Sequence, residues 1–427
     1  MLLSLLAPLA IVLQNAAPAP SGASAESAPP ARPNILLIVG DDLGYGELGC
    51  YGQRKIDTPR LDALAREGLR FTDFYAGAPV CAPSRCALMT GLHGGHAFVR
   101  DNFELDEGQL PIPAGTVTLP RLLQTSGYAT AMIGKWGLGG PRTSGEPLEQ
   151  GFDEWFGFYC QRRAQTFYPE ELWRDGKRVA LDGNAPDGAS GTQYAEDLFM
   201  EEAERFLRRD HGKPFFLYLP FTLPHLALQP EAEDLERYRG RFDEVPYHGE
   251  RGYLPHRTPR AAYAAMISRL DRDVGRLLDL LDELGLAEDT LVLFMSDNGP
   301  TFDIGGVDTK FFDSTAGLRG RKGTVYEGGL RVPLIARWKG HTPVGAVSGC
   351  VAASYDLLPT LLELSGLPPL AGIDGQSFAA ELTGGSAPAH EFLLWEFHGY
   401  GGQIAVRMGR WKGVHMGLLE RPRSFEL

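Results

Sequence analysis

The sequence predicts an α/β protein with a large, mostly parallel central sheet flanked by helices, and a small antiparallel subdomain at its C-terminal end. Short apolar runs bounded by turn residues recur along the chain, with helical patterns between them. Such alternation is typical of a parallel sheet covered on both faces. The 427 residues, of which 43% are hydrophobic and 22% charged, suffice for one large domain and exclude a disordered or fibrous chain.

The expected elements follow in chain order. We expect buried strands at 35–39, 129–133, 215–219, 291–295 and 332–338. We expect helices at 58–67, 195–208, 260–284 and 354–364. The first helix has the clearest start signal, because Thr58 is a preferred cap and Pro59 fits a first turn.

We expect the main domain at residues 33–369. One further segment precedes it and another follows it. Residues 1–32 join an apolar run to an Ala/Pro/Ser stretch, which predicts a signal peptide and linker and hence a secreted or periplasmic protein, although no Lys or Arg precedes the run. Residues 370–427 should form the antiparallel subdomain. Its strands are expected at 392–397, 403–408 and 411–414. No later stretch reaches the ~18 apolar residues of a membrane span.

The charge and cysteine content exclude several classes. The formal net charge of -13 disfavours broad attraction to nucleic acid or anionic lipid, so an anionic substrate must be held by local cations. Five cysteines are too few and too scattered for a disulfide framework, and they lack the close pairs of a zinc site.

Two segments each allow two interpretations. Residues 229–258 are polar and without periodicity, which fits either a long surface loop near a functional site or a tolerated insertion. Seven aromatic residues between Trp155 and Trp173 are interleaved with Arg162 and Arg163, which fits either a sugar-binding rim or a satellite core.

Two acidic pairs follow expected strands directly. Asp41 and Asp42 come after the first strand, and Asp297 and Asn298 come after the strand that ends at 295. In open α/β sheets, ligands bind at the carboxyl ends of the strands. Three carboxylates and an amide oxygen form the oxygen-only set that holds Ca²⁺ or Mg²⁺, and they would repel one another without a cation. An isolated acidic pair is more often a turn or a helix cap.

Two more strand ends carry titratable side chains. Lys135 follows the strand at 129–133, and His225 follows the strand at 215–219. Each alone is compatible with a solvated lysine or an ordinary loop histidine. Their shared position at strand ends favours a role in the same site as the acidic pairs.

The segment 81–91 predicts a short helix that begins near Cys81. Pro83 suits a first helical turn, and Gly91 suits a helix end. A helix amino terminus favours a reactive anion or a bound oxyanion, and Arg85 adds a cation on the first turn. The alternative is that Cys81 is a small buried hydrophobe, as most lone cysteines are.

The run Cys81-Ala82-Pro83-Ser84-Arg85 resembles the Cys-x-Pro-Ser-Arg signature of the type I, arylsulfatase-like sulfatases of the alkaline phosphatase superfamily. The other motifs of that family follow in the family's order over nearly everything after residue 32. They are matched by residues 34–46, Gly134-Lys135-Trp136, Pro224-His225, Ser296-Asp297-Asn298-Gly299, Gly320-Arg321-Lys322-Gly323 and residues 327–333. The resemblance implies an alkaline-phosphatase-like fold, with 33–369 as the sulfatase catalytic domain.

The resemblance also implies a catalytic group and a metal site. Cys81 would be converted to formylglycine by a dedicated maturation enzyme, and the hydrate of formylglycine would be the nucleophile. Ca²⁺, with Mg²⁺ as an alternative, would bind one oxygen of the modified Cys81 together with the two pairs that follow strands. These ligands would be Asp41, Asp42, Asp297 and Asn298.

The remaining family roles fall on four basic residues. Arg85 would steady the hydrate, and Lys135 and Lys322 would neutralise sulfate oxygens. His225 would protonate the leaving alcohol, a task that typically contributes ~10²–10⁴-fold.

This chain departs from the family pattern at several positions. Family members have a histidine where Gly137 stands. His93 and His96, just past the signature helix, are the nearest candidates in sequence to replace it, and the alternative is that they are helix-end or packing residues. Relatives also carry histidines at the positions of Arg163 and Gln165. They continue into a last helix beyond the end of this chain, which suggests a truncated C-terminus.

The function implied is hydrolysis of a sulfate monoester on a carbohydrate or aryl alcohol. A first alternative is a phosphomonoester, phosphodiester or phosphonate hydrolase of the same superfamily. Against it, simple phosphatases there use Ser or Thr and commonly two metals with histidine ligands, whereas this chain offers Cys81 and one oxygen-rich site. A second alternative, suggested by Gly137, is a non-catalytic protein that binds sulfated glycans. The intact Cys81 and metal ligands argue against it.

Overall fold

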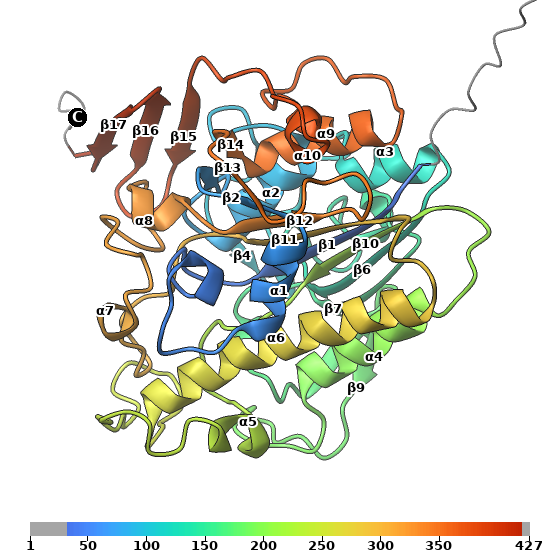
Figure 1. Ribbon diagram of the computed structural model, residues 1–427. Coiled ribbons are helices and arrows are strands. Elements are labelled where there is room, and N and C mark those ends of the chain that lie inside the picture. The colour runs from blue at the N-terminus through green and yellow to red at the C-terminus, as the bar shows by residue number, and fades with distance from the viewer. Residues whose placement is uncertain (1–31, 421–427) are drawn as a thin grey trace, which may run out of the picture. The chain divides into compact units, whose positions relative to one another are not determined.

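A computed structural model describes residues 32–420, and both the expected signal peptide and the last seven residues lie outside this range. One ten-stranded sheet dominates it, with the strand order β13-β2-β12-β11-β1-β10-β6-β7-β8-β9 (Figure 1). The strands of this sheet are β1 (Asn34–Gly40), β2 (Leu69–Phe71), β6 (Ala129–Lys135), β7 (Glu154–Phe158), β8 (Glu171–Arg174), β9 (Lys177–Ala180), β10 (Phe215–Pro220), β11 (Thr290–Ser296), β12 (Leu334–Arg337) and β13 (Ala346–Ser348). Two short pairs lie outside it: β3 (Phe74–Tyr75) with β14 (Ala352–Ala353), and β4 (Glu104–Leu105) with β5 (Gly108–Gln109).

The centre of the sheet is parallel, as predicted. Strands β11, β1, β10, β6 and β7 pair in parallel, and β12, β8 and β9 add antiparallel pairs at the two flanks. The expected strand at 332–338 is therefore present as β12, but it is antiparallel to β11. Between β11 and β12 the chain forms only α7 (Thr309–Phe312) and α8 (Glu327–Leu330), so no crossover helix returns it to the start of the sheet.

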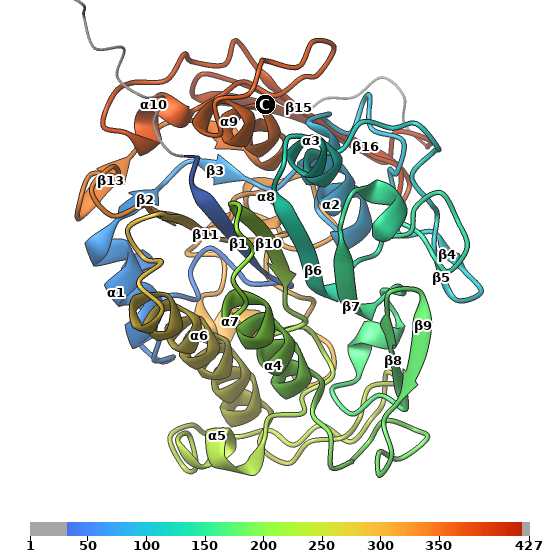
Figure 2. The ribbon, with the colours of Figure 1, turned by 90° about the vertical axis from the view of Figure 1, so that its right-hand side faces the viewer.

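Helices cover both faces of the sheet because its central strands are apolar on both sides. In β1, Leu36 and Ile38 face one core, whereas Leu37 and Val39 face the other. Figure 2 shows the helices in these two layers. The first layer holds α1 (Pro59–Glu67), α4 (Ala195–Leu207) and α6 (Pro259–Glu283). The second holds α2 (Cys81–Thr90), α3 (Leu119–Thr125), α9 (Leu357–Leu364) and α10 (Ala379–Leu382).

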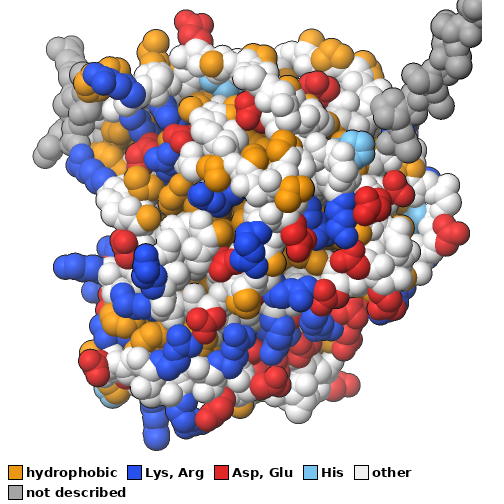
Figure 3. Space-filling view, viewed as in Figure 1, with side chains coloured by type: hydrophobic (Ala, Val, Ile, Leu, Met, Phe, Trp, Pro, Cys, Tyr) orange, Lys and Arg blue, Asp and Glu red, His pale blue; other side chains and the backbone are white. Residues whose placement is uncertain are grey.

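The four expected helices are all present. They are α1, α4, α6 and α9, and a 3₁₀ turn at Ser354–Asp356 precedes α9. The exposed side of α6 is covered with both signs of charge, which Figure 3 shows interspersed over this face. Arg272 and Arg276 of this helix pair with Asp234 and Glu204 at 2.7 and 2.6 Å. No helix within 32–420 is long and apolar enough to cross a bilayer.

The predicted antiparallel sheet near the C-terminus is confirmed. It consists of β15 (Leu393–Phe397), β16 (Gln403–Met408) and β17 (Trp411–Met416). The buried indole of Trp395 packs on Tyr75, with ring centroids 5.3 Å apart, and donates to the carbonyl of Ala76 at 2.9 Å. This contact places the small sheet beside the segment that leads into α2, while the domain boundary at 370 stays a prediction.

The aromatic segment after residue 154 belongs mainly to the core. Five of its rings are buried: Trp155, Phe156, Phe158, Tyr159 and Phe167. Tyr168 and Trp173 are partly buried against the same two cores. The core interpretation is therefore confirmed for the five buried rings.

The segment 229–258 is more ordered than the sequence suggests. It contains α5 (Ala232–Glu236) and an antiparallel bridge between Tyr247 and His256. Tyr253 is mostly buried, which raises its pKa, and it lies within electrostatic reach of Lys322 and Asp42. The segment thus borders the site that its first interpretation predicted.

Candidate active site

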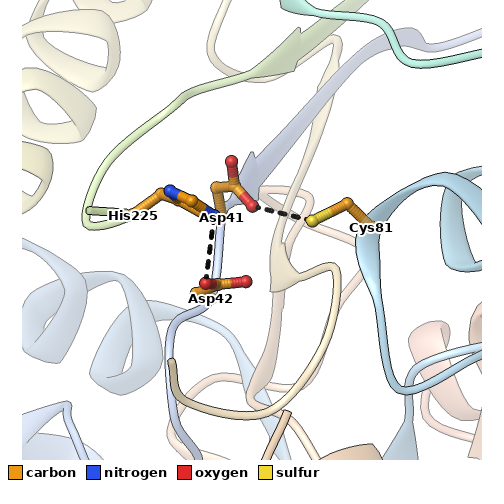
Figure 4. Close-up of side chains that lie close together, drawn as sticks. All are labelled: Asp41, Asp42, Cys81 and His225. Atoms are coloured by element: carbon orange, nitrogen blue, oxygen red, sulfur yellow. Dashed lines mark hydrogen bonds and ion pairs between the residues drawn. The ribbon is translucent and has the colours of Figure 1, made fainter. Parts of the chain in front are cut away.

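The predicted strand-end residues meet at one edge of the central sheet. Lys135 is the last residue of β6, and Asp41, His225 and Asp297 follow β1, β10 and β11. These four strands are parallel neighbours, so their carboxyl ends lie together. The start of α2 faces them with Cys81 (Figure 4). One ligand atom each from Asp41, Asp42, Cys81 and His225 lies within 4.8 Å of the others.

Cys81 is at the centre of this cluster. Its Sγ lies 3.5 Å from an oxygen of Asp41, from Nζ of Lys135 and from Nζ of Lys322. The side chain is 1% exposed, and burial raises the pKa of the thiol to about 12 in spite of the two lysines. A thiol with this pKa stays protonated near neutral pH and is a poor nucleophile as encoded.

Two buried lysines neutralise the acidic pair after β1. Lys135 pairs with Asp41, and Lys322 contacts both oxygens of Asp42, at 2.6 and 2.7 Å. Burial disfavours the charged form of each lysine, but the carboxylates outweigh it, so the pKa values of both lysines are raised. Both therefore remain charged beside Cys81, as binding of an anion requires.

Arg85 links two of the strand ends that form the site. Its guanidinium donates to Asp297 from Nε at 3.1 Å and from Nη2 at 2.8 Å, and Nη1 donates to the carbonyl of Lys135. Asp297 also accepts a hydrogen bond from the backbone N–H of Asp42 at 3.1 Å. Arg85 thus ties the ends of β6 and β11 together, and its predicted contact with the hydrate stays a prediction.

His225 is oriented by its own loop. Its Nδ1 lies 2.5 Å from the carbonyl of Leu226, which can only accept, so Nδ1 carries a proton. Nε2 faces the site, 3.4 Å from an oxygen of Asp42. Burial and the charge of Lys322 lower the pKa of this imidazole. Nε2 is therefore the atom that can exchange a proton with a substrate.

The donor set fits a hard cation. The Nδ2 of Asn298 donates to Asp42 at 2.8 Å, whereas its buried Oδ1 has no hydrogen-bond donor among the described residues. This acceptor belongs to a residue that contacts Asp42 and directly follows Asp297 in the chain. An unpaired oxygen among carboxylates is satisfied by Ca²⁺ or Mg²⁺, which prefer oxygen ligands.

The two ends of the helix α2 carry groups that the sequence analysis singled out. The backbone N–H of Ala82 is already bound by Oδ1 of Asn102 at 2.9 Å, so this amide is not available to an oxyanion. His93 and His96 follow the far end of α2, about 15 Å along the helix from Cys81 at 1.5 Å per residue. They stack on each other, and His96 contacts Asp374 at 2.8 Å. Both lie in a cluster with Asp374, so the hypothesis that either replaces a side chain at Gly137 stays a prediction.

Gln403 is a supporting residue that the sequence analysis missed. This residue of β16 is 1% exposed, accepts a hydrogen bond from the N–H of Val325 at 3.0 Å and donates to the carbonyl of Gly323 at 2.8 Å. It thereby holds the loop that carries Lys322. The available signal was a polar residue on the inward face of a strand, in phase with the buried Ala405.

A cavity of about 680 Å³ lies beside β7 and β8. Its lining includes Arg162, Arg163, Gln165 and Trp173, together with acidic residues near Glu104. The two departures from the family pattern at 163 and 165 therefore line one polar space.

Known proteins resemble this chain over most of its length. A family model described as Sulfatase matches residues 33–367. The chain is 34% identical over 406 residues to the N-acetylgalactosamine-6-sulfatase of Canis lupus familiaris, covering 90% of this chain and 72% of that protein. It is 34% identical to arylsulfatase A of Homo sapiens, covering 89% and 74% of the two chains.

A solved structure agrees with the sequence comparisons. The crystal structure of Ps i-CgsB in complex with k-i-k-neocarrahexaose superposes with a TM-score of 0.76 at 29% identity, covering 92% of this chain and 85% of that chain. The family match, the relatives and the ten-stranded fold all agree. The chain therefore belongs to the sulfatase family and is a sulfuric ester hydrolase.

Proposed function

We propose that this sulfatase removes sulfate from a carbohydrate, using formylglycine made from Cys81 by a maturation enzyme and a bound Ca²⁺ ion. The observation that carries the proposal is the position of Cys81. A buried thiol with a pKa of about 12 lies 3.5 Å from two lysines, so residue 81 is placed for an anionic substrate but is unreactive as encoded. We also propose export, on the basis of residues 1–32.

The residues around Cys81 have complementary tasks in this reaction. Lys135 and Lys322 hold the oxygens of the sulfate group and offset the charge that develops on them. His225 delivers a proton from Nε2 to the oxygen of the leaving alcohol. Arg85 keeps Asp297 and the end of β6 in place.

The two absent groups would each supply one piece of chemistry. A hydrated aldehyde at residue 81 supplies a hydroxyl nucleophile together with a second hydroxyl that helps to release sulfate. Ca²⁺, held by Asp41, Asp42, Asp297 and Asn298 with an oxygen of residue 81, supplies a Lewis acid for a sulfate oxygen.

Several features support a carbohydrate as the alcohol. The polar cavity near Arg163 has room for a sugar ring and offers Trp173 as an aromatic wall. One relative is named for N-acetylgalactosamine, and a structural neighbour was solved with a carrahexaose.

The test is the activity of matured protein on sulfated mono- and oligosaccharides, an aryl sulfate, and matched phosphate and phosphonate esters. We expect sulfated sugars to give the highest kcat/KM. A preference for phosphorus esters would support the first alternative function instead. Tight binding of a sulfated glycan without turnover, by protein whose residue 81 is formylglycine by peptide mass, would support the second.

Removing the metal should lower both activity and stability. A ligand that binds only the folded state contributes about 2.7 kcal/mol at a concentration one hundred times its Kd, so chelation should lower Tm as it inactivates the enzyme. Asp297→Ala should lose the bound metal, as measured by elemental analysis. Asp374→Ala, in the separate cluster with His93 and His96, should keep it. Equal metal content in wild type and Asp297→Ala would contradict the assignment.

A further inference from the structure

A buried carboxamide without any partner lies next to the active site. Gln161 is 7% exposed, and neither its Nε2 nor its Oε1 makes a hydrogen bond to any described residue. Burying an amide without hydrogen bonds costs free energy, so such groups in native proteins call for an explanation. A ligand that is not part of the chain is one partner that would explain it.

The amide occupies the space that a side chain at position 137 would need. A Cβ built on Gly137 would lie only 1.7 Å from Nε2 of Gln161. Gly137 also has a φ of 85°, in the left-handed region that favours glycine. Gly137 and Gln161 are therefore complementary: the missing side chain of one makes room for the amide of the other.

The position of Gly137 places this amide beside the catalytic cations. The pairing with the strand β7 continues past Lys135, through the N–H groups of Trp136 and Gly137, which donate to Phe158 and Tyr159 at 2.9 and 3.1 Å. Position 137 is two residues beyond Lys135, whose ammonium lies 3.5 Å from Cys81.

The backbone of Gln161 is anchored, whereas its side chain is not. Its N–H donates to the carboxamide oxygen of Gln109 at 3.2 Å when the O and N atoms of that amide are exchanged, the orientation that satisfies both atoms. The preceding Cys160 and the following Arg162 both contact Glu104. The segment is therefore held from both sides with the amide left unpaired.

We propose that Gln161 is a substrate-binding residue whose Nε2 donates a hydrogen bond to an oxygen of the sulfate group, beside Lys135 and Lys322. This inference rests on the proposed function, since it assigns the third donor for the same anion. Sulfate oxygens only accept hydrogen bonds, so the amide nitrogen is the atom that faces them. The neutral amide adds a directed donor without adding charge to a site that already holds two buried lysines.

The test uses Gln161→Met, which keeps the length of the side chain and removes its polar atoms. A hydrogen bond to a charged group predicts a fall in kcat/KM of about 10- to 100-fold, and a similar rise in the inhibition constant of inorganic sulfate. Tm should stay the same or rise, because an unpaired amide leaves the interior. Gln161→Glu should weaken sulfate binding further, because a carboxylate repels the anion.

Gln150→Met is the matched control. This glutamine is 3% exposed, and its Nε2 donates to the carbonyl of Ser144 at 2.5 Å. Its replacement should lower Tm and leave kcat/KM unchanged, the opposite of the result for Gln161→Met. Unchanged kcat/KM and sulfate inhibition in Gln161→Met would overturn the proposal. A loss of Tm as large as in the control would overturn it as well, since it would indicate a structural role.

Binding of inorganic sulfate, measured by calorimetry, separates this inference from the proposed function. Wild-type protein that binds sulfate more tightly than Gln161→Met, yet hydrolyses no sulfated sugar, would refute the proposed function and support the inference. If wild type hydrolyses sulfated sugars and both proteins bind inorganic sulfate with equal affinity, the proposed function is supported and the inference about Gln161 is refuted.

Discussion

Replacing Cys81 with alanine should reduce turnover of every sulfate ester by about 10³-fold or more, as expected when a nucleophile is removed. The reason is geometric: the Sγ position is the point that Asp41, Lys135 and Lys322 all approach at about 3.5 Å.

Peptide mass and kinetics check this prediction together. Wild-type protein co-expressed with a maturation enzyme should carry formylglycine at residue 81. Cys86→Ala is the matched control, because Cys86 is an equally buried cysteine of the same helix that packs in the core instead of facing the site. The control should retain its kcat while losing some stability. Full activity in Cys81→Ala, or an unmodified Cys81 in active protein, would contradict the assignment.

Replacing His225 with alanine should slow hydrolysis of a sulfated sugar by about 10²- to 10⁴-fold, the usual contribution of a general acid. The same change should slow an activated aryl sulfate far less, because a good leaving group needs little protonation. The orientation of the His225 ring supports a role in protonating the leaving group. Nδ1 is committed to the carbonyl of Leu226, and Nε2 faces the site beside Asp42.

The measurement is the dependence of the rate on the pKa of the leaving group, compared for wild type and His225→Ala. The slope should be steeper in the variant. His211→Ala serves as the control, because that histidine contacts Phe206 at the end of α4 and should leave the slope unchanged. An equal loss for sugar and aryl substrates would show that His225 acts on another step.

Much of the fold could be predicted because its signals are local. The apolar runs of β1 and β11 are buried on both faces, so their sequences are nearly continuous in hydrophobic residues and easy to recognise. The start of α2 was likewise marked by Pro83 and its end by Gly91. The direction of β12 was not predictable, because it depends on the path of the chain between β11 and β12 and not on the residues of the strand.

The sequence by itself determined which chemical groups this sulfatase possesses. It also determined that several of these groups lie at the ends of strands. Asp41, Lys135, His225 and Asp297 each follow an apolar run, and parallel strands bring their carboxyl ends to one edge. Only the tertiary structure decided which other residues join them. His93 and His96 are near Cys81 in sequence but separated from it by the length of a rigid helix. Gln161 reaches Gly137, and Gln403 secures the Lys322 loop, through contacts between segments that no periodicity links. Such contacts depend on how whole elements pack, because a side chain's neighbours in a folded core are set by the shapes of surfaces that are distant along the chain.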